Sequence, residues 1–125
     1  MHPITVIMTS NLPATYKEVF KTDKGVVYQC DVTNRLILEF WDTHTALSAR
    51  DFAQFRRMVE TVDVRQMALS TDAAYDVEIL TPPRSERCYV LSLCEIIHLR
   101  ELLTGARLML DLNAMLRECG CSLVE

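Results

Sequence analysis

The residues best suited to catalysis or metal binding are five cysteines and three histidines, since their side chains bind metals and act as nucleophiles. Cys119 and Cys121 are the only close pair, and a single residue separates them. Zinc sites usually combine four Cys or His ligands, in pairs spaced by about two to four residues. Cys30, His44 and His98 would have to converge on the pair through the fold. We therefore expect free cysteines, with no metal and no other cofactor.

A second candidate is Cys94 with His98, four residues apart on a predicted helix and so on one face. A thiolate beside an imidazole could act as a nucleophile. No Asn or Asp is placed by sequence to orient this histidine, so a packed cysteine and a boundary histidine explain the pair as well. His44, beside Asp42 in a turn, could form a proton relay, although Asp and Thr are ordinary turn residues. His44, Cys94 and His98 together are the alternative polar site.

Charge disfavours nucleic acid as a ligand. The chain has a net charge of −4, with no basic run to neutralise phosphates. Four aromatic residues could in principle stack on bases, but no basic groove is interleaved with them. They are Tyr28, Trp41, Tyr75 and Tyr89. The three glycines are isolated, so there is no glycine-rich phosphate loop.

The elements that would position these residues form an internal repeat. Residues 47–59 align without a gap with residues 91–103. Each segment opens with a serine suited to cap a helix, Ser48 or Ser92, and an acidic residue follows three positions later. Apolar residues then recur at helical spacing in both copies. They are Phe52, Phe55, Met58 and Val59 in the first copy, and Ile96, Leu99, Leu102 and Leu103 in the second.

Three strands precede each predicted helix. In the first copy they cover residues 25–30, 35–41 and 43–47; in the second they cover 66–70, 76–80 and 87–91, with Val77 and Ile79 toward the core. The pattern predicts an α+β fold built from a duplicated β-β-β-α unit, mostly antiparallel, with helices on one face of the sheet. The repeats span about residues 25–60 and 66–104 of a single domain, 1–125.

Two segments lie outside the repeats. Residues 1–24 could hold one strand, at 5–8, followed by an irregular stretch. Residues 105–118 continue as a C-terminal helix, and Gly105 could bend or end the helix before it. This last helix has more apolar surface than a small sheet can cover, so it is either a core helix or an interface with another subunit. The candidate interface residues are Leu108, Met109, Leu112, Met115 and Leu116.

Composition limits the classes of protein to which the chain can belong. Half of the 125 residues are hydrophobic. A short chain cannot bury that many apolar side chains internally, and the remainder often form a subunit interface. The odd number and irregular spacing of the cysteines differ from a disulfide framework. There is no cationic leader and no stretch near the roughly 20 apolar residues of a membrane helix. We therefore expect a cytoplasmic protein that does not enter a membrane.

The hydrophobic and capping pattern resembles that of a family of small uncharacterised bacterial proteins. The resemblance runs through residues 27–40, 47–55 and 101–116. That family has no assigned activity, so the resemblance implies neither a reaction nor a site. The duplicated unit is also similar in outline to some folds that bind single-stranded nucleic acid.

The sequence favours a non-enzymatic protein-interaction module that acts as a homodimer. Three features support this: the excess of apolar residues, the apolar stripe left uncovered on the last helix, and the lack of a recognisable combination of catalytic residues. A small ligand-binding domain or enzyme, with its site at the junction of the two repeats, is the alternative. Binding of single-stranded nucleic acid is a second alternative.

Overall fold

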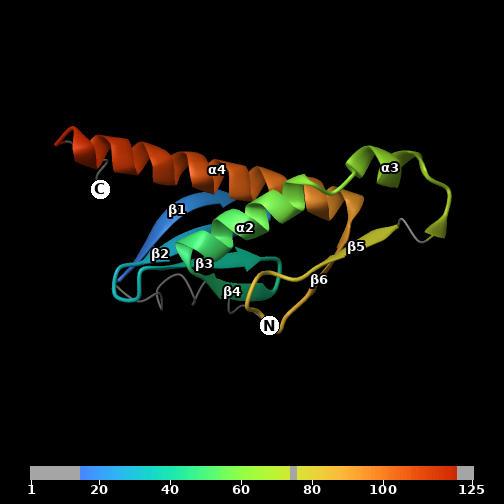
Figure 1. The fold of residues 1–125 in the computed structure, drawn as a ribbon, viewed down its shortest axis with the longest axis horizontal. Coiled ribbons are helices and arrows are strands. Elements are labelled where there is room, and N and C mark those ends of the chain that lie inside the picture. The colour runs from blue at the N-terminus through green and yellow to red at the C-terminus, as the bar shows by residue number, and fades with distance from the viewer. Residues whose placement is uncertain (1–14, 74–75, 121–125) are drawn as a thin grey trace.

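The computed structural model describes residues 15–73 and 76–120, which fold into an α+β structure, as predicted (Figure 1). A four-stranded antiparallel sheet comes first, with strands in chain order: β1 (Tyr16–Thr22), β2 (Gly25–Cys30), β3 (Arg35–Phe40) and β4 (Thr43–Leu47). Two helices follow, α2 (Ala49–Glu60) and α3 (Val64–Leu69). A two-stranded antiparallel sheet, β5 (Val77–Leu80) and β6 (Tyr89–Ser92), then leads into the long helix α4 (Leu93–Glu118).

Alternation along the strands gives the four-stranded sheet one apolar face. Val27, Leu38 and Leu47 point to that face and are buried. The register places Val27 directly opposite Leu38, so apolar side chains meet across the strands. Glu39 and His44, from the alternate positions, are paired on the opposite face.

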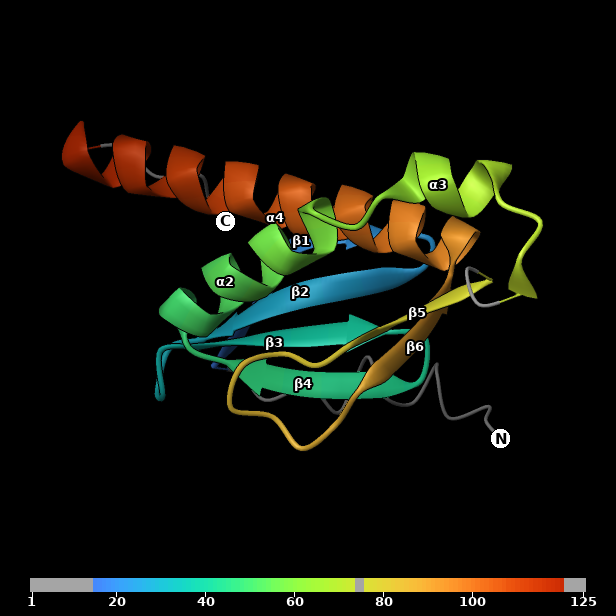
Figure 2. The ribbon, with the colours of Figure 1, turned by 45° about the vertical axis from the view of Figure 1, so that its right-hand side comes forward.

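Helices α2 and α4 cover the apolar face of this sheet (Figure 2). Their caps form as predicted. The Ser48 hydroxyl accepts a hydrogen bond from the Asp51 backbone N–H at 3.1 Å. The Ser92 hydroxyl accepts from the Glu95 N–H at 3.4 Å, and Glu95 Oε1 in turn accepts from the Ser92 N–H at 2.8 Å, which completes a capping box.

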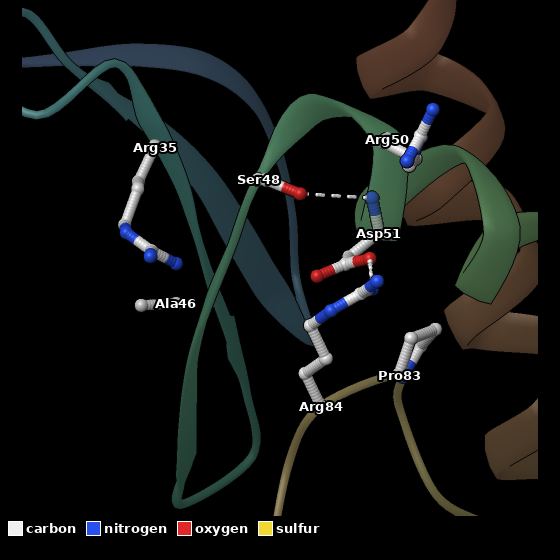
Figure 3. A pocket seen from close by; sticks show the side chains of 7 residues that line it. All are labelled: Arg35, Ala46, Ser48, Arg50, Asp51, Pro83 and Arg84. Carbon is white, nitrogen blue, oxygen red and sulfur yellow. Dashed lines mark hydrogen bonds and ion pairs between the residues drawn. The ribbon is translucent and has the colours of Figure 1, made fainter.

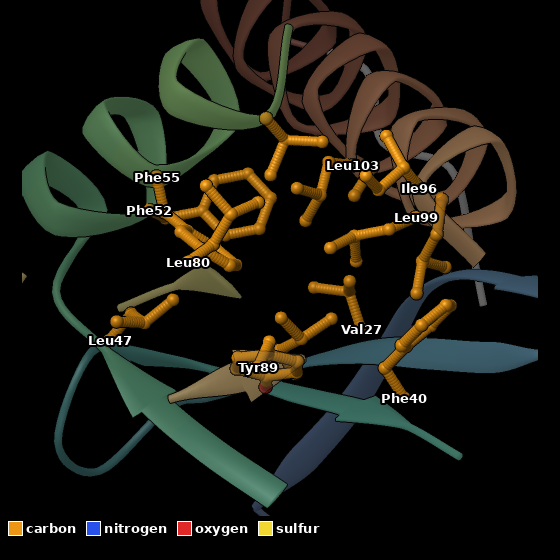
Figure 4. Close-up of a cluster of buried hydrophobic side chains, with 14 of the residues drawn as sticks. Val27, Phe40, Leu47, Phe52, Phe55, Leu80, Tyr89, Ile96, Leu99 and Leu103 are labelled. Atoms are coloured by element: carbon orange, nitrogen blue, oxygen red, sulfur yellow. The ribbon is translucent and has the colours of Figure 1, made fainter. Parts of the chain in front are cut away.

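One hydrophobic core joins the parts of the described chain (Figure 4). Phe55 of α2 and Leu99 of α4 are fully buried in it, together with Val27 from the sheet. The hairpin β5–β6 contributes Leu80, and also Tyr89, whose ring centroid lies 5.6 Å from that of Phe55. Both predicted repeats therefore share a single core.

The predicted strand at residues 66–70 is wrong, because this segment forms helix α3. The Asp63 side chain accepts a hydrogen bond from the Gln66 N–H at 2.9 Å and caps the helix. Met67 is the buried residue of this short helix. The order of two strands and a serine-capped helix does occur twice, but the duplication itself stays a prediction.

The N-terminal part also differs from the prediction. Residues 16–22 form β1, where we expected an irregular stretch. The strand shows no clean alternation because its pairing with β2 shifts between Glu18 and Phe20. The predicted strand at residues 5–8 lies outside the described residues.

Gly105 does not end the last helix, since α4 runs unbroken through it from Leu93 to Glu118. The second repeat's helix and the C-terminal helix are therefore one element. A side chain at Gly105 would overlap the ring of Phe20 from β1. Glycine at this position lets β1 and α4 approach each other closely. Within the described residues, no helix is long and apolar enough to cross a membrane.

Candidate functional site

The polar residues proposed as one site lie on different layers of the molecule. His44 is on β4, where its Nε2 lies 3.1 Å from Glu39 Oε2 on the outer face of the sheet. Its partner is thus the glutamate opposite it and not Asp42. Cys94 and His98 are on α4, which covers the other face. The structure does not bring the three together.

Cys94 and His98 do not form a nucleophile pair in the part of the chain that the structure describes. Cys94 is exposed, and no hydrogen bond joins it to His98. His98 is half-buried at a cavity of about 290 Å³ between α4 and the β1–β2 turn, which Cys94 does not line. The described residues also hold no group of three or more His, Cys, Asp or Glu suited to a metal. Cys121 lies outside them.

Those of the four aromatic residues that the structure describes do not gather into a surface for stacking bases. Tyr89 is buried, and its hydroxyl lies 2.6 Å from Thr45 Oγ1. Trp41 is exposed in the β3–β4 turn, with the Lys24 ammonium 5.1 Å from its ring centroid. Tyr75 lies outside the described residues.

The surroundings of Tyr28 are acidic. Partial burial raises the pKa of the Tyr28 phenol, and the nearby carboxylates of Glu39 and Glu18 raise it further. The same carboxylates would repel the phosphates of a nucleic acid. This face of the sheet is therefore a poor candidate for a nucleic-acid interface.

The candidate interface is a stripe on the C-terminal half of α4. Leu108, Leu112 and Met115 are 66%, 37% and 60% exposed, respectively, and their spacing places them on one side of the helix. Leu103 and Ala106 are fully buried on the opposite side. This half of α4 is thus apolar on two sides, and only one of them faces the core of its own chain. We call Leu108, Leu112 and Met115 the α4 stripe.

The other two predicted interface residues lie at the border of the stripe. Met109 and Leu116 are half-buried, and Met109 packs against the core. Leu110, which sequence reasoning left off the stripe, also packs against the core. The last turns of α4 extend beyond the end of the sheet in both views of the fold (Figures 1 and 2).

A second exposed apolar surface was not predicted. Val77, Ile79 and Val90 are 43%, 62% and 56% exposed on the outer side of the β5–β6 hairpin. The prediction that Val77 and Ile79 point to the core is wrong, because Leu80 and its alternate neighbour Glu78 take the inward side. Ile79 lies opposite Val90 in the register, so the two side chains form one exposed cross-strand pair.

Comparison with known proteins assigns no family. No family model matches the chain, and no curated protein or solved structure matches it either. The resemblance to small bacterial proteins stays a prediction, as does the cytoplasmic location.

Proposed function

We propose that this chain is a non-enzymatic protein-interaction module that acts as a homodimer, with the α4 stripe at the dimer interface. The observation that carries the proposal is the exposure of Leu108, Leu112 and Met115 on a projecting helix. Soluble monomers rarely leave an aligned set of large apolar side chains in water. A second copy of the same helix is the partner that would cover them.

The stripe is suited to pairing with itself. In an antiparallel pair with a two-fold axis near Leu112, Leu108 of one copy faces Met115 of the partner subunit. Such an isologous contact uses the same surface twice. Arg107 lies near one end of the stripe and Glu118 near the other, so opposite charges would meet across the pair. Arg107 is held only by an exposed pair with Asp111, at 3.6 Å, and is free to exchange partners.

The expected interface is small. One helix face buries less than the roughly 1,200 Å² of a standard interface. We therefore expect a dimer that dissociates on dilution, with a Kd on the order of micromolar.

Light scattering over a dilution series from about 100 µM to about 1 µM tests the proposal. We expect the mass to rise with concentration toward twice the 14.3 kDa of one chain. The double variant Leu108→Glu, Met115→Glu should stay at the monomer mass, because burying the new charges in the interface costs desolvation energy. Both positions are exposed, so its unfolding free energy should change by less than about 1 kcal/mol.

Gln54→Glu is the control, because it places a glutamate at an exposed position of α2 away from the stripe. It should keep the wild-type mass curve. A wild-type protein that stays at 14.3 kDa throughout the series would contradict the homodimer. A double variant with the wild-type mass curve would place the interface elsewhere.

A further inference from the structure

A groove of about 350 Å³ lies where the first repeat meets the loop between β5 and β6 (Figure 3). The first repeat contributes residues from β3, β4 and the start of α2, and the loop contributes two more. The lining residues are Arg35, Ala46, Ser48, Arg50, Asp51, Pro83 and Arg84. None of them belongs to the α4 stripe.

The groove is cationic in an acidic protein. Its lining has three guanidinium groups and one carboxylate, whereas the whole chain has a net charge of −4. Across residues 15–73 and 76–120, neither Arg35 nor Arg50 makes an ion pair or side-chain hydrogen bond. Two positive charges therefore remain unneutralised beside a concave surface, which is the electrostatic setting of an anion site.

Arg84 is fixed in place by its surroundings. Its Nη1 donates to Asp51 Oδ1 at 2.6 Å, and the Asp51 side chain is only 7% exposed. The Arg84 backbone has φ +58°, a conformation that costs energy for a residue other than glycine. Pro82, fully buried, anchors the turn, and the Ser85 N–H donates to its carbonyl at 3.2 Å. The guanidinium is thus held in one orientation while 69% of its side chain stays exposed.

The three arginines approach the groove from different sides. In Figure 3, Arg84 rises from the loop toward Asp51, and Arg35 lies across the end of β4 from it. The exposed Arg50 side chain points away from Arg84, so Arg50 adds positive charge at the rim. Asp51 does not cancel this field, because its charge is already matched by Arg84.

We infer that this groove binds the phosphate group of a small phosphorylated molecule, with Arg35 and Arg84 as the main contacts. A phosphate monoester has a charge of about −1.5 to −2 at neutral pH, which the unneutralised charges of Arg35 and, at the rim, Arg50 would balance. The planar fork of arginine donors suits phosphate oxygens. The volume lies near the lower end of small-molecule sites, so a metabolite fits better than a polymer.

Thermal unfolding in the presence of inorganic phosphate or pyrophosphate, against sodium chloride at equal ionic strength, tests the inference. Both probes should raise the Tm of the wild-type protein above the chloride control, since a ligand of the folded state stabilises it. Arg35→Gln should weaken the fitted affinity at least about tenfold, by removing a charge-assisted hydrogen bond. Arg50→Gln should weaken it less, because only a rim charge is lost.

Arg65→Gln on α3 is the matched control, because it removes the same charge from an exposed position outside the groove. It should leave the response to phosphate unchanged. The inference is overturned if phosphate and pyrophosphate stabilise the wild type no more than chloride does. It is equally overturned if Arg35→Gln and Arg65→Gln respond alike.

Discussion

The two serine-capped helices begin alike and differ in the acidic residue three positions beyond the cap. In α4, Glu95 reaches back to the Ser92 N–H at 2.8 Å, so the cap closes on itself. In α2, the aspartate is one methylene shorter, and its carboxylate instead binds Arg84 from the other repeat. A difference of one methylene thus accompanies two different contacts. Glu95 completes a local cap, whereas Asp51 pairs with a residue 33 positions away. The same sequence signal can stabilise one helix or join two halves of a fold.

The two predicted repeats also differ in how completely they bury their apolar side chains. The first, residues 25–60, places its strands in a four-stranded sheet and buries one face of α2. The second has only the β5–β6 hairpin, because its expected first strand is α3. Its hairpin exposes Val77, Ile79 and Val90, and its helix exposes the α4 stripe. The surface suited to a partner is therefore concentrated in the second half of the chain.

The largest expected effects come from truncating the matched core positions of the two helices. Phe55 and Leu99 occupy the same place in the repeats, and both are fully buried in the shared core. Phe55→Ala should lower the unfolding free energy by about 3–5 kcal/mol and Leu99→Ala by about 2–5 kcal/mol. Urea denaturation measures both losses. Fluorescence of the single Trp41 reports on the first repeat, and far-UV circular dichroism reports mainly on α4.

If the repeats form one cooperative unit, the two signals should give the same midpoint in each variant. The exposed positions Gln54 and Glu101 provide controls, and alanine there should change stability by about 0.5 kcal/mol or less. Separate midpoints in Leu99→Ala would contradict the shared core. They would show that the first repeat stays folded when the second is lost.

The next effect concerns the hydrogen bond that links the repeats inside the core. Tyr89 of β6 and Thr45 of β4 are both buried, with their hydroxyl oxygens 2.6 Å apart. Tyr89→Phe leaves the Thr45 hydroxyl without this partner and should cost about 1–3 kcal/mol near pH 7. Adding Thr45→Val should recover part of that loss, because both polar groups are then gone.

The same residue gives a pH dependence. Burial raises the pKa of the Tyr89 phenol above its ordinary value, although the hydrogen bond with Thr45 opposes this in part. Above about pH 10 the unfolded chain releases a proton that the folded protein still holds, so stability falls as pH rises through the folded pKa. Below that range the phenol is protonated in both states, and its contribution is constant. Wild type should lose more stability than Tyr89→Phe between about pH 9 and about pH 11. Equal losses would show that Tyr89 does not titrate in this way.

The parts of the fold that sequence predicted correctly depend on local signals. Ser48 and Ser92 mark helix starts, and the alternation in β3 and β4 identifies strands with one apolar face. The α3 segment gave an ambiguous signal, because its apolar residues suit either structure. Asp63, which caps the helix, was the local sign of a helix start. Alternation in β5 separates two sides of the strand, yet cannot say which one meets the core. The packing of the hairpin against the core places Leu80 on the buried side and Ile79 on the exposed side.

The two candidate sites also differ in whether local sequence signals could predict them. The α4 stripe follows from helical spacing, and it consists of the three exposed residues among the five predicted interface residues. The arginine groove could not be predicted, because its residues come from strands, a helix and a distant loop. The conformation of Arg84, with φ +58°, has no sequence signature such as a glycine. Contacts of this kind depend on how the two repeats pack against each other.

The smallest effect tests the comparison of the caps directly. Asp51→Asn should cost about 1–2 kcal/mol, less than a fully buried ion pair because Arg84 is 69% exposed. Glu95→Gln should cost only a few tenths, since an amide oxygen can still accept from the Ser92 N–H. A double-mutant cycle with Arg84→Gln should show coupling to Asp51 and none to Glu95. Salt at about 1 M should reduce the coupling to Asp51, because it screens the exposed guanidinium.

Equal costs for the two substitutions, with no coupling to Arg84, would mean that both acidic residues act only as caps. The Asp51–Arg84 contact would then add nothing to the hydrophobic core and the Thr45–Tyr89 hydrogen bond that join the repeats. Coupling that appears only at Asp51 would instead show that Arg84 is held by the first repeat. Because the same contact orients a guanidinium of the arginine groove and neutralises its charge, phosphate affinity should then change in Asp51→Asn and stay unchanged in Glu95→Gln.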